Sequence, residues 1–176
     1  MKLGYSTWGM PMEPIGSSLA HLAKLGFEGV ELTVIPGYTT ELGALDAAER
    51  RRIRELYRQH GLEMPAIAAH TTFLDPDPAR HALHMERLTQ ALDLAVEIAP
   101  GDTPPALNTT PGGRPEEWEA VRERLVERVG DMARQAASRG IVLALEPHVG
   151  ASVDRPERVL WLLEQVNSPH LKINFD

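Results

Sequence analysis

The chain has 176 residues and a net charge of −7, from 25 acidic and 18 basic side chains. This length predicts one domain, and the content of 43% hydrophobic and 24% charged residues excludes a disordered chain. There is no cysteine, which excludes disulfide frameworks, thiolate metal sites and cysteine nucleophiles. The acidic balance disfavours nucleic acid as a partner, because phosphate backbones are bound by basic groups. With no membrane-spanning run and no secretory signal in the sequence, we expect a cytoplasmic protein without a membrane partner.

Short strand-like runs alternate with longer helix-like runs along the chain. The predicted strands cover residues 2–6, 29–34, 63–69, 106–108, 141–145 and 171–175. The predicted helices between them cover residues 18–26, 46–61, 77–99, 115–140 and 154–166. Capping residues support two of the helix starts: Asp46 is followed by Glu49 three residues later, and Asp77 is followed by proline.

The alternation of strands and helices, without hairpin signals between strands, indicates a parallel sheet in an α/β fold. Both an open doubly wound sheet and a (β/α)₈ TIM barrel have this pattern. No Gly-x-Gly-x-x-Gly motif follows the first strand, although dinucleotide-binding sheets carry one there. At the observed strand spacing, eight units would need about 270 residues, close to the usual barrel length. We therefore predict that residues 1–176 form a single TIM barrel domain of about six βα units, truncated before strands seven and eight.

Polar residues follow the predicted strands at their carboxyl ends, where barrel enzymes carry their active sites. Glu146 and Asp176 end the fifth and sixth strands, so we expect their carboxylates to lie side by side. Two carboxylates at the spacing of neighbouring strands repel each other unless a cation or a proton is shared. Such a pair suits Mn²⁺, Mg²⁺, Co²⁺ or Zn²⁺. The alternative is that both carboxylates only pair with arginines or cap helices.

Other candidate residues at this rim allow two interpretations each. Glu31 lies within the second strand, as a substrate contact or as a partner of Arg or Lys. By pattern alone, His70 fits a hydrogen-bonded core histidine slightly better than a functional one. Trp8 could form a pocket wall or simply pack in its loop. His148 lies two residues beyond Glu146 and points to the same side if the strand continues that far. The remaining histidines, such as His84, fall on helices or helix ends and are expected at the surface.

Five segments together resemble the xylose isomerase-like barrels, also called sugar phosphate isomerases and epimerases. The segments are residues 4–8, 26–32, 68–70, 144–148 and 173–176. The resemblance implies a divalent metal held by Glu146, Asp176, and a His and a Glu from strands seven and eight. It also implies that Glu146 moves a proton as the catalytic residue. Trp8, His70, Asn108 and His148 would line the substrate pocket, and Glu31 is a further substrate-contact candidate.

The resulting hypothesis is a metal-dependent sugar (phosphate) isomerase or epimerase that transfers a proton through a metal-stabilised enediolate. The alternatives are an inosose-type dehydratase on the same scaffold, a DNA-repair enzyme of the apurinic-site endonuclease type, and a non-catalytic truncated product. The expected partner is a small-molecule sugar or cyclitol. Six strands would leave two open sheet edges, which a homo-oligomer could cover.

Overall fold

The computed structural model describes residues 2–176. Strands and helices alternate along this part of the chain. In order, they are β1 (Gly4–Ser6), α1 (Ile15–Lys24), β2 (Gly29–Thr33), α2 (Ala47–His60), β3 (Ala66–Ala68), α3 (Pro78–Ile98), β4 (Ala106–Thr109), α4 (Trp118–Ser138), β5 (Leu143–Leu145), α5 (Pro156–Val166) and β6 (Leu171–Ile173). Short 3₁₀ turns lie at Thr7–Gly9, Leu42–Ala44 and Pro115–Glu117.

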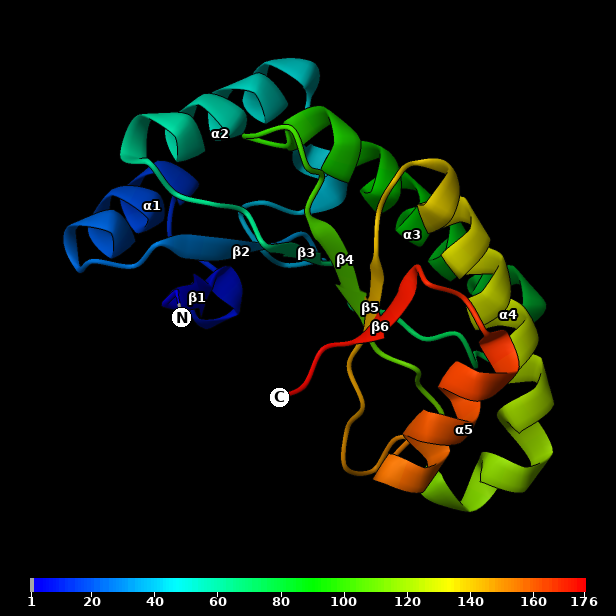
Figure 1. The fold of residues 1–176 in the computed structure, drawn as a ribbon. Coiled ribbons are helices and arrows are strands. Elements are labelled where there is room, and N and C mark those ends of the chain that lie inside the picture. The colour runs from blue at the N-terminus through cyan, green and yellow to red at the C-terminus, as the bar shows by residue number, and fades with distance from the viewer. Residues whose placement is uncertain (1) are drawn as a thin grey trace.

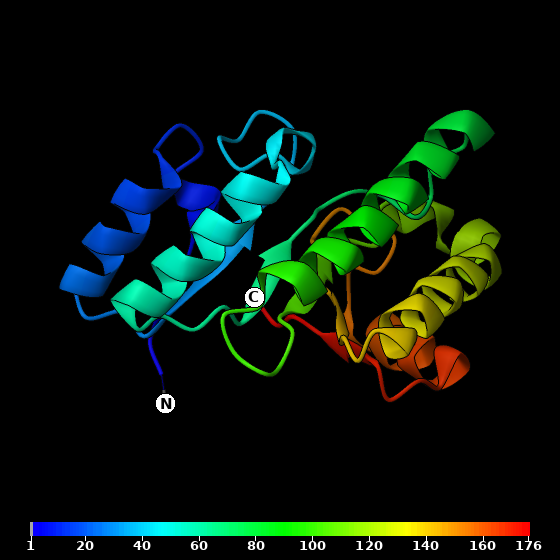
Figure 2. The same ribbon diagram turned by 90° about the horizontal axis from the view of Figure 1, so that it is seen from above.

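All six strands form one parallel sheet in the order β1-β2-β3-β4-β5-β6. The sheet is curved, the helices cover its outer side, and the two termini lie on its open inner side (Figure 1). Seen from above, the helices follow one another around the sheet in chain order (Figure 2). A doubly wound sheet reverses its strand order at a switch point, whereas barrel strands are sequential. The structure therefore confirms the prediction of a partial TIM barrel, with six parallel strands and the five helices that connect them.

The apolar core lies between the sheet and the helices. Leu32, Ile67, Leu107 and Leu143 project from the strands into this layer and are fully buried. Tyr57 of α2 is also fully buried, and its hydroxyl donates a hydrogen bond of 3.1 Å to the carbonyl of Val30. This burial raises the pKa of Tyr57 far above its usual range. Successive side chains of a strand point to opposite faces of the sheet. Because the apolar side chains point outward to the helices, the polar residues between them face the barrel interior.

The helix caps predicted at Asp46 and Asp77 are confirmed, whereas α5 begins at Pro156 with Arg155 and not Asp154 at the N-cap position, and some other element ends also differ from the predictions. Asp46 accepts a hydrogen bond of 2.8 Å from the Glu49 amide, and Asp77 caps α3. Helix α1 begins at Ile15, three residues before the predicted start at Ser18. The reason is that Pro14 takes the N-cap position, and Ser18 lies in the first turns with its hydroxyl bonded to the Pro14 carbonyl. Strand β6 ends at Ile173, two residues earlier than predicted.

Within residues 2–176, the structure contains no helix that combines the length and the apolar character needed to cross a bilayer.

The loop after β4 depends on Gly112, which gives a stability prediction. Gly112 has φ of +76°, and a Cβ there would overlap the side chain of Thr72. Its carbonyl also accepts hydrogen bonds from the amide and hydroxyl of Ser152, so the loop cannot easily shift. We expect Gly112→Ala to lower the free energy of unfolding by about 2 kcal/mol, measured by urea titration. The control Gly43→Ala, where a Cβ meets no atom within 4 Å, should change stability by less than about 0.5 kcal/mol.

Candidate functional site

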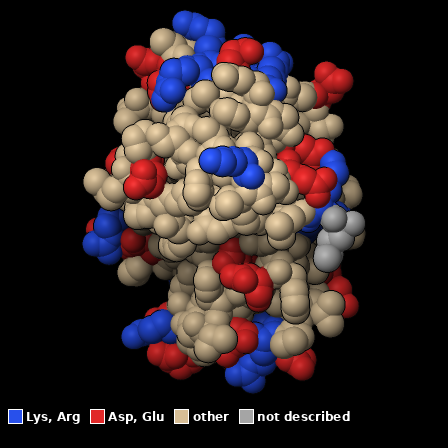
Figure 3. Space-filling view, turned by 90° about the vertical axis from the view of Figure 1, so that its left-hand side faces the viewer, with Lys and Arg blue, Asp and Glu red and all other residues tan. Residues whose placement is uncertain are grey.

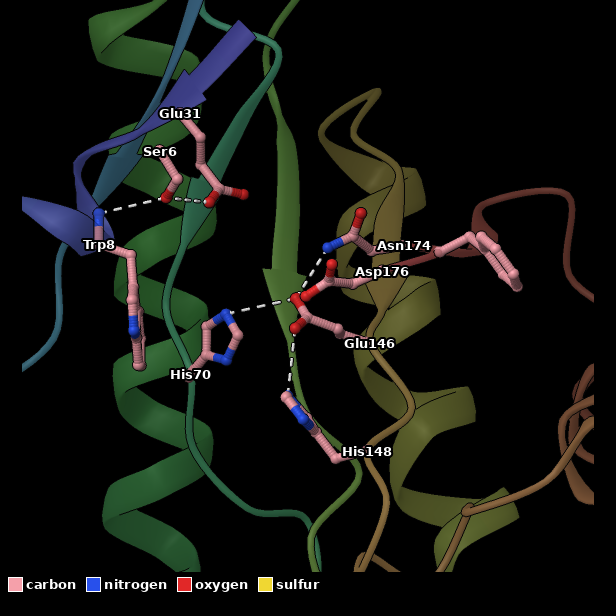
Figure 4. A pocket seen from close by; sticks show the side chains of 9 residues that line it. Ser6, Trp8, Glu31, His70, Glu146, His148, Asn174 and Asp176 are labelled. Carbon is pink, nitrogen blue, oxygen red and sulfur yellow. Dashed lines mark hydrogen bonds and ion pairs between the residues drawn. The ribbon is translucent and has the colours of Figure 1, made fainter.

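A cavity of about 470 Å³ lies at the carboxyl ends of the strands. Its walls come from the ends of β1, β2, β3, β5 and β6 and the loops that follow them. The lining residues are Ser6, Trp8, Glu31, His70, Glu146, His148, Asn174, Phe175 and Asp176. Figure 4 shows the side chains of Glu31, His70, Glu146, His148 and Asn174 directed toward this cavity. Six of the predicted candidates therefore line one pocket, and Asn108 does not.

Strand periodicity explains how Glu146 reaches the pocket. Leu143 and Leu145 are buried in the layer against the helices. Ala144 and Glu146 therefore take the opposite, inner face of β5 and its extension. The register pairs Asn108 of β4 with Ala144, which brings the Asn108 side chain to the same inner face.

Glu146 is a buried carboxylate in contact with two asparagine amides and two histidines. It is 7% exposed, and its Oε2 accepts hydrogen bonds from Asn108 Nδ2 at 2.8 Å and Asn174 Nδ2 at 2.7 Å. His148 Nε2 lies 3.1 Å from the other oxygen, Oε1, and His70 Nε2 lies 3.7 Å from Oε2. No Lys or Arg of the described residues forms a salt bridge with it. The two amides thus bind Oε2, and the other oxygen, Oε1, faces His148.

His70, Glu146 and His148 form a cluster suited to a divalent cation. One ligand atom from each lies within 4.8 Å of the others. Two imidazoles and a carboxylate match the ligand preferences of Zn²⁺, Co²⁺ and Mn²⁺. Burial lowers the pKa of His70, while the carboxylates of Glu146 and Glu31 act against that shift. The net direction favours neutral imidazole, the form that binds metal.

Asp176 lines the same pocket as Glu146, and the two side chains lie at its β5–β6 side (Figure 4). Asp176 is exposed, whereas Glu146 is buried. The three-residue cluster contains His148 rather than Asp176. His148 contacts Glu146 although strand β5 ends at Leu145, before both residues. A shared metal between Glu146 and Asp176 stays a prediction.

Glu31 and Asn108 lie on the inner side of the sheet beside Glu146. Glu31 accepts hydrogen bonds from Ser6 Oγ at 2.7 Å and from Asn108 Nδ2 at 3.3 Å. Among residues 2–176 it has no salt bridge to Lys or Arg, so the salt-bridge interpretation of Glu31 is wrong for the described chain. Asn108 is 2% exposed, and it is not among the residues that line the pocket. Its Nδ2 donates hydrogen bonds to the carboxylates of both Glu31 and Glu146. Its Oδ1 is buried and has no hydrogen-bond partner among the described residues.

Trp8 forms one wall of the pocket. It is 48% exposed, and its ring centroid lies 5.0 Å from that of His70 and 5.8 Å from that of Tyr38. The Tyr38 hydroxyl donates to the Trp8 carbonyl at 3.1 Å. The indole is therefore held in place from one side and keeps an open apolar surface.

Sequence reasoning places Ser6 and Asn174 among the polar residues at the strand ends without assigning them a role, and it does not identify Phe175 as a lining residue. Ser6 pairs with Glu31 in the β1–β2 register, and a register cannot be read from a single sequence. Asn174 does carry a signal, because it lies two residues before Asp176 and alternates with the apolar Ile173. Its bond to Glu146 depends on a contact between neighbouring strands.

The loop that follows His70 is fixed by a chain of polar contacts. The Thr71 hydroxyl lies 2.6 Å from His84 Nδ1, and His84 Nε2 lies 3.3 Å from Asp75 Oδ2. His84 is half-buried, because its side chain is 27% exposed and lies between these partners. Asp75 also accepts hydrogen bonds from Arg80 and from the Asp77 amide.

These contacts predict a pH-dependent contribution of Asp75 to stability. Hydrogen bonds from Arg80, the Asp77 amide and His84 lower the pKa of Asp75 from 3.8 to about 2. A lowered pKa means that the stabilisation is complete above pH 3.8 and is lost as the pH falls toward 2. We expect Asp75→Asn to be less stable than wild type at pH 7, with the difference shrinking between pH 4 and pH 2. Urea titrations of both proteins across this range measure it, and a constant difference would contradict it.

Comparison with known proteins identifies relatives of this architecture. A family model described as "Xylose isomerase-like TIM barrel" matches residues 19–176. The solved structures similar in fold include a probable 3-DHS dehydratase, AsbF, from Bacillus anthracis, with a TM-score of 0.80, 23% identity, and coverage of 100% of this chain and 63% of that one. The IOLI protein with a bound zinc atom has a TM-score of 0.80, 16% identity, and coverage of 98% and 62%. The 3-keto-D-glucoside 4-epimerase YcjR from E. coli has a TM-score of 0.81, 14% identity, and coverage of 100% and 68%.

At these identities the likeness to solved structures establishes the fold. The chain spans about 63% of the length of the first of these neighbours and 62% of the second. No curated protein matches the chain.

Proposed function

Because the chain belongs to the xylose isomerase-like TIM barrel family, we propose that its pocket is a divalent-metal-dependent isomerase or epimerase site for a sugar or sugar phosphate. The observation that carries this proposal is the environment of Glu146. A buried carboxylate without a Lys or Arg partner is costly unless a proton or a cation compensates its charge. Two histidines converge on this same carboxylate, which favours a cation.

The residues present fit a divalent ion. Glu146, His70 and His148 would hold it, and Asp176 offers a second carboxylate in the same pocket. Mn²⁺, Co²⁺ and Zn²⁺ suit this mixed nitrogen and oxygen set, and Mg²⁺ suits the carboxylates alone. A bound divalent ion supplies Lewis-acid stabilisation of negative charge on substrate oxygens.

The side chains of the chain itself would perform the proton transfer. Asn108 and Asn174 hold one oxygen of Glu146, and the other oxygen faces His148 at the pocket. Glu146 would take the proton from the carbon next to a substrate carbonyl, as a positioned general base. The open face of Trp8 would pack on the C–H face of the substrate, and Glu31 would accept hydrogen bonds from its hydroxyl groups.

Proton exchange into the substrate tests this proposal. The chain is loaded with Mn²⁺ and incubated with ketohexoses and their phosphates in D₂O, and products are followed by NMR. We expect deuterium at the carbon next to the carbonyl together with an epimer or isomer, and loss of both after treatment with a chelator. Formation of an unsaturated product with loss of water would indicate a dehydratase instead. Exchange that persists at full rate in the presence of the chelator would contradict a metal-dependent site.

A further inference from the structure

His70 lies beyond the regular part of the sheet. Strand β3 ends at Ala68, and the last backbone hydrogen bond to β4 before His70 runs from the Ala69 amide to the Asn108 carbonyl, at 2.9 Å. The imidazole of His70 forms no hydrogen bond within residues 2–176, because even Nε2 lies 3.7 Å from the nearest Glu146 oxygen. The direction of His70 therefore depends on how the loop around it is held.

Thr71, the next residue, is held at three points. Its amide donates to Thr109 Oγ1 at 3.4 Å, and its carbonyl accepts from Thr110 Oγ1 at 2.7 Å. Its hydroxyl lies 2.6 Å from Nδ1 of His84, on α3. The first two contacts fix the Thr71 backbone against the end of β4, and the third connects Thr71 to the outer layer of helices.

Asp75 sets the proton arrangement of His84. The carboxyl group of Asp75 has a pKa of about 2, so it is ionised at neutral pH and only accepts hydrogen bonds. Its Oδ2 lies 3.3 Å from Nε2 of His84. In the neutral imidazole this places the proton on Nε2 and leaves Nδ1 to accept the hydrogen bond from the Thr71 hydroxyl.

Histidines that bind metal usually have a partner that fixes the direction of the ring. The indole of Trp8 packs beside the His70 ring, with 5.0 Å between the ring centroids, but offers it no hydrogen-bond acceptor. Resting on the proposed function, we infer that His84 is a positioning residue that acts through Thr71 to hold His70 in the direction needed for a divalent cation. His84 does not line the pocket, so it would affect a cation that it cannot touch.

The charge around the pocket does not depend on this contact. On the face shown in Figure 3, acidic side chains lie near the middle beside a hollow, whereas Lys and Arg lie mostly toward its margins. Such charges attract a cation whatever the direction of His70. Substitutions of Thr71 and His84 that leave every carboxylate in place therefore test direction and not attraction.

Three variants isolate the hydrogen bond between Thr71 and His84. Thr71→Val removes the hydroxyl and keeps the shape of the side chain, and His84→Leu removes the acceptor. His84→Asn puts an amide oxygen at the place of Nδ1, so it can still accept from Thr71. The control His21→Leu removes a histidine from an exposed position on α1.

The affinity of each variant for Mn²⁺ is measured by calorimetry, at a temperature at which circular dichroism shows it to be folded. We expect Thr71→Val and His84→Leu each to weaken Mn²⁺ binding by about tenfold or more. The double variant should lose no more than either single variant, because both changes break the same hydrogen bond. His84→Asn should recover most of the loss, and His21→Leu should match wild type.

The imidazole of His70 gives a second readout that needs no metal. In NMR spectra of the metal-free chain with ¹⁵N-labelled histidine, the His70 ring signals should shift or broaden in His84→Leu and return toward wild type in His84→Asn. If His84 only supported the stability of the fold, these signals would stay in place.

The outcomes separate this inference from the function on which it rests. The inference is overturned by wild-type affinity in His84→Leu, by losses that add in the double variant, or by no recovery in His84→Asn, and the proposed function then stands. Failure of the wild-type chain to bind Mn²⁺ contradicts the proposed function, and the His70 ring signals then decide the inference. If His84→Leu does not fold, Thr71→Val decides it in the same two measurements.

Discussion

Replacement of Glu146 by glutamine is expected to weaken binding of Mn²⁺ or Zn²⁺ by about 100-fold or more. The same change should leave the midpoint of thermal unfolding within about 4 °C of wild type. Glutamine has the same shape, and its carbonyl oxygen can still accept the hydrogen bonds from Asn108 and Asn174. What it lacks is the negative charge that two imidazoles and a cation would share. Metal titration by calorimetry and a thermal melt in the presence of chelator measure the two effects separately.

The matched control for this variant is Glu164→Gln, on the exposed side of α5. It removes the same charge from the chain and should leave metal affinity unchanged. If Glu146→Gln binds metal as tightly as wild type, the pocket does not use this carboxylate as a ligand. If Glu146→Gln unfolds instead, the fold itself depends on the negative charge of Glu146.

The sequence predicts the fold well because its local signals agree with one another. Alternating apolar runs fix the strands, and the caps at Asp46 and Asp77 fix two helix starts. These signals depend on neighbours within a few residues, which a single sequence contains. The predicted start of α1 is wrong because Pro14, and not a Ser or Asp, takes the N-cap position there.

The candidate site is less predictable because it depends on contacts between strands. The positions of the strand ends place Glu146, Asp176 and His70 at one rim. They do not show which of these side chains are in contact. The cluster around Glu146 includes His148, and its hydrogen bonds come from Asn108 and Asn174. The direction of each side chain depends on register, rotamer and burial, which strand periodicity alone does not contain.

Asn108 gives the second large prediction, because it separates two carboxylates inside the fold. Its Nδ2 donates to Glu31 at 3.3 Å and to Glu146 at 2.8 Å, and it is 2% exposed. Asn108→Asp would remove both donated hydrogen bonds and add a third negative charge at the same place. We expect it to lower the free energy of unfolding by about 3 kcal/mol at pH 7 without metal, measured by urea titration with chelator.

A second variant, Asn108→Leu, distinguishes the effect of the added charge from the loss of hydrogen bonds. It removes the donors without adding a charge, so it should lower the stability of the fold. Added Mn²⁺ should then raise its stability by no more than it raises that of wild type. In Asn108→Asp the third carboxylate should make the fold gain more stability from added Mn²⁺ than wild type gains, since a ligand that binds only the folded state stabilises it. If Asn108→Asp without metal were as stable as wild type, Glu31 and Glu146 would not need the amide between them. The hydrogen bonds that Asn108 donates would then result from the packing of β4 and would not be required for stability.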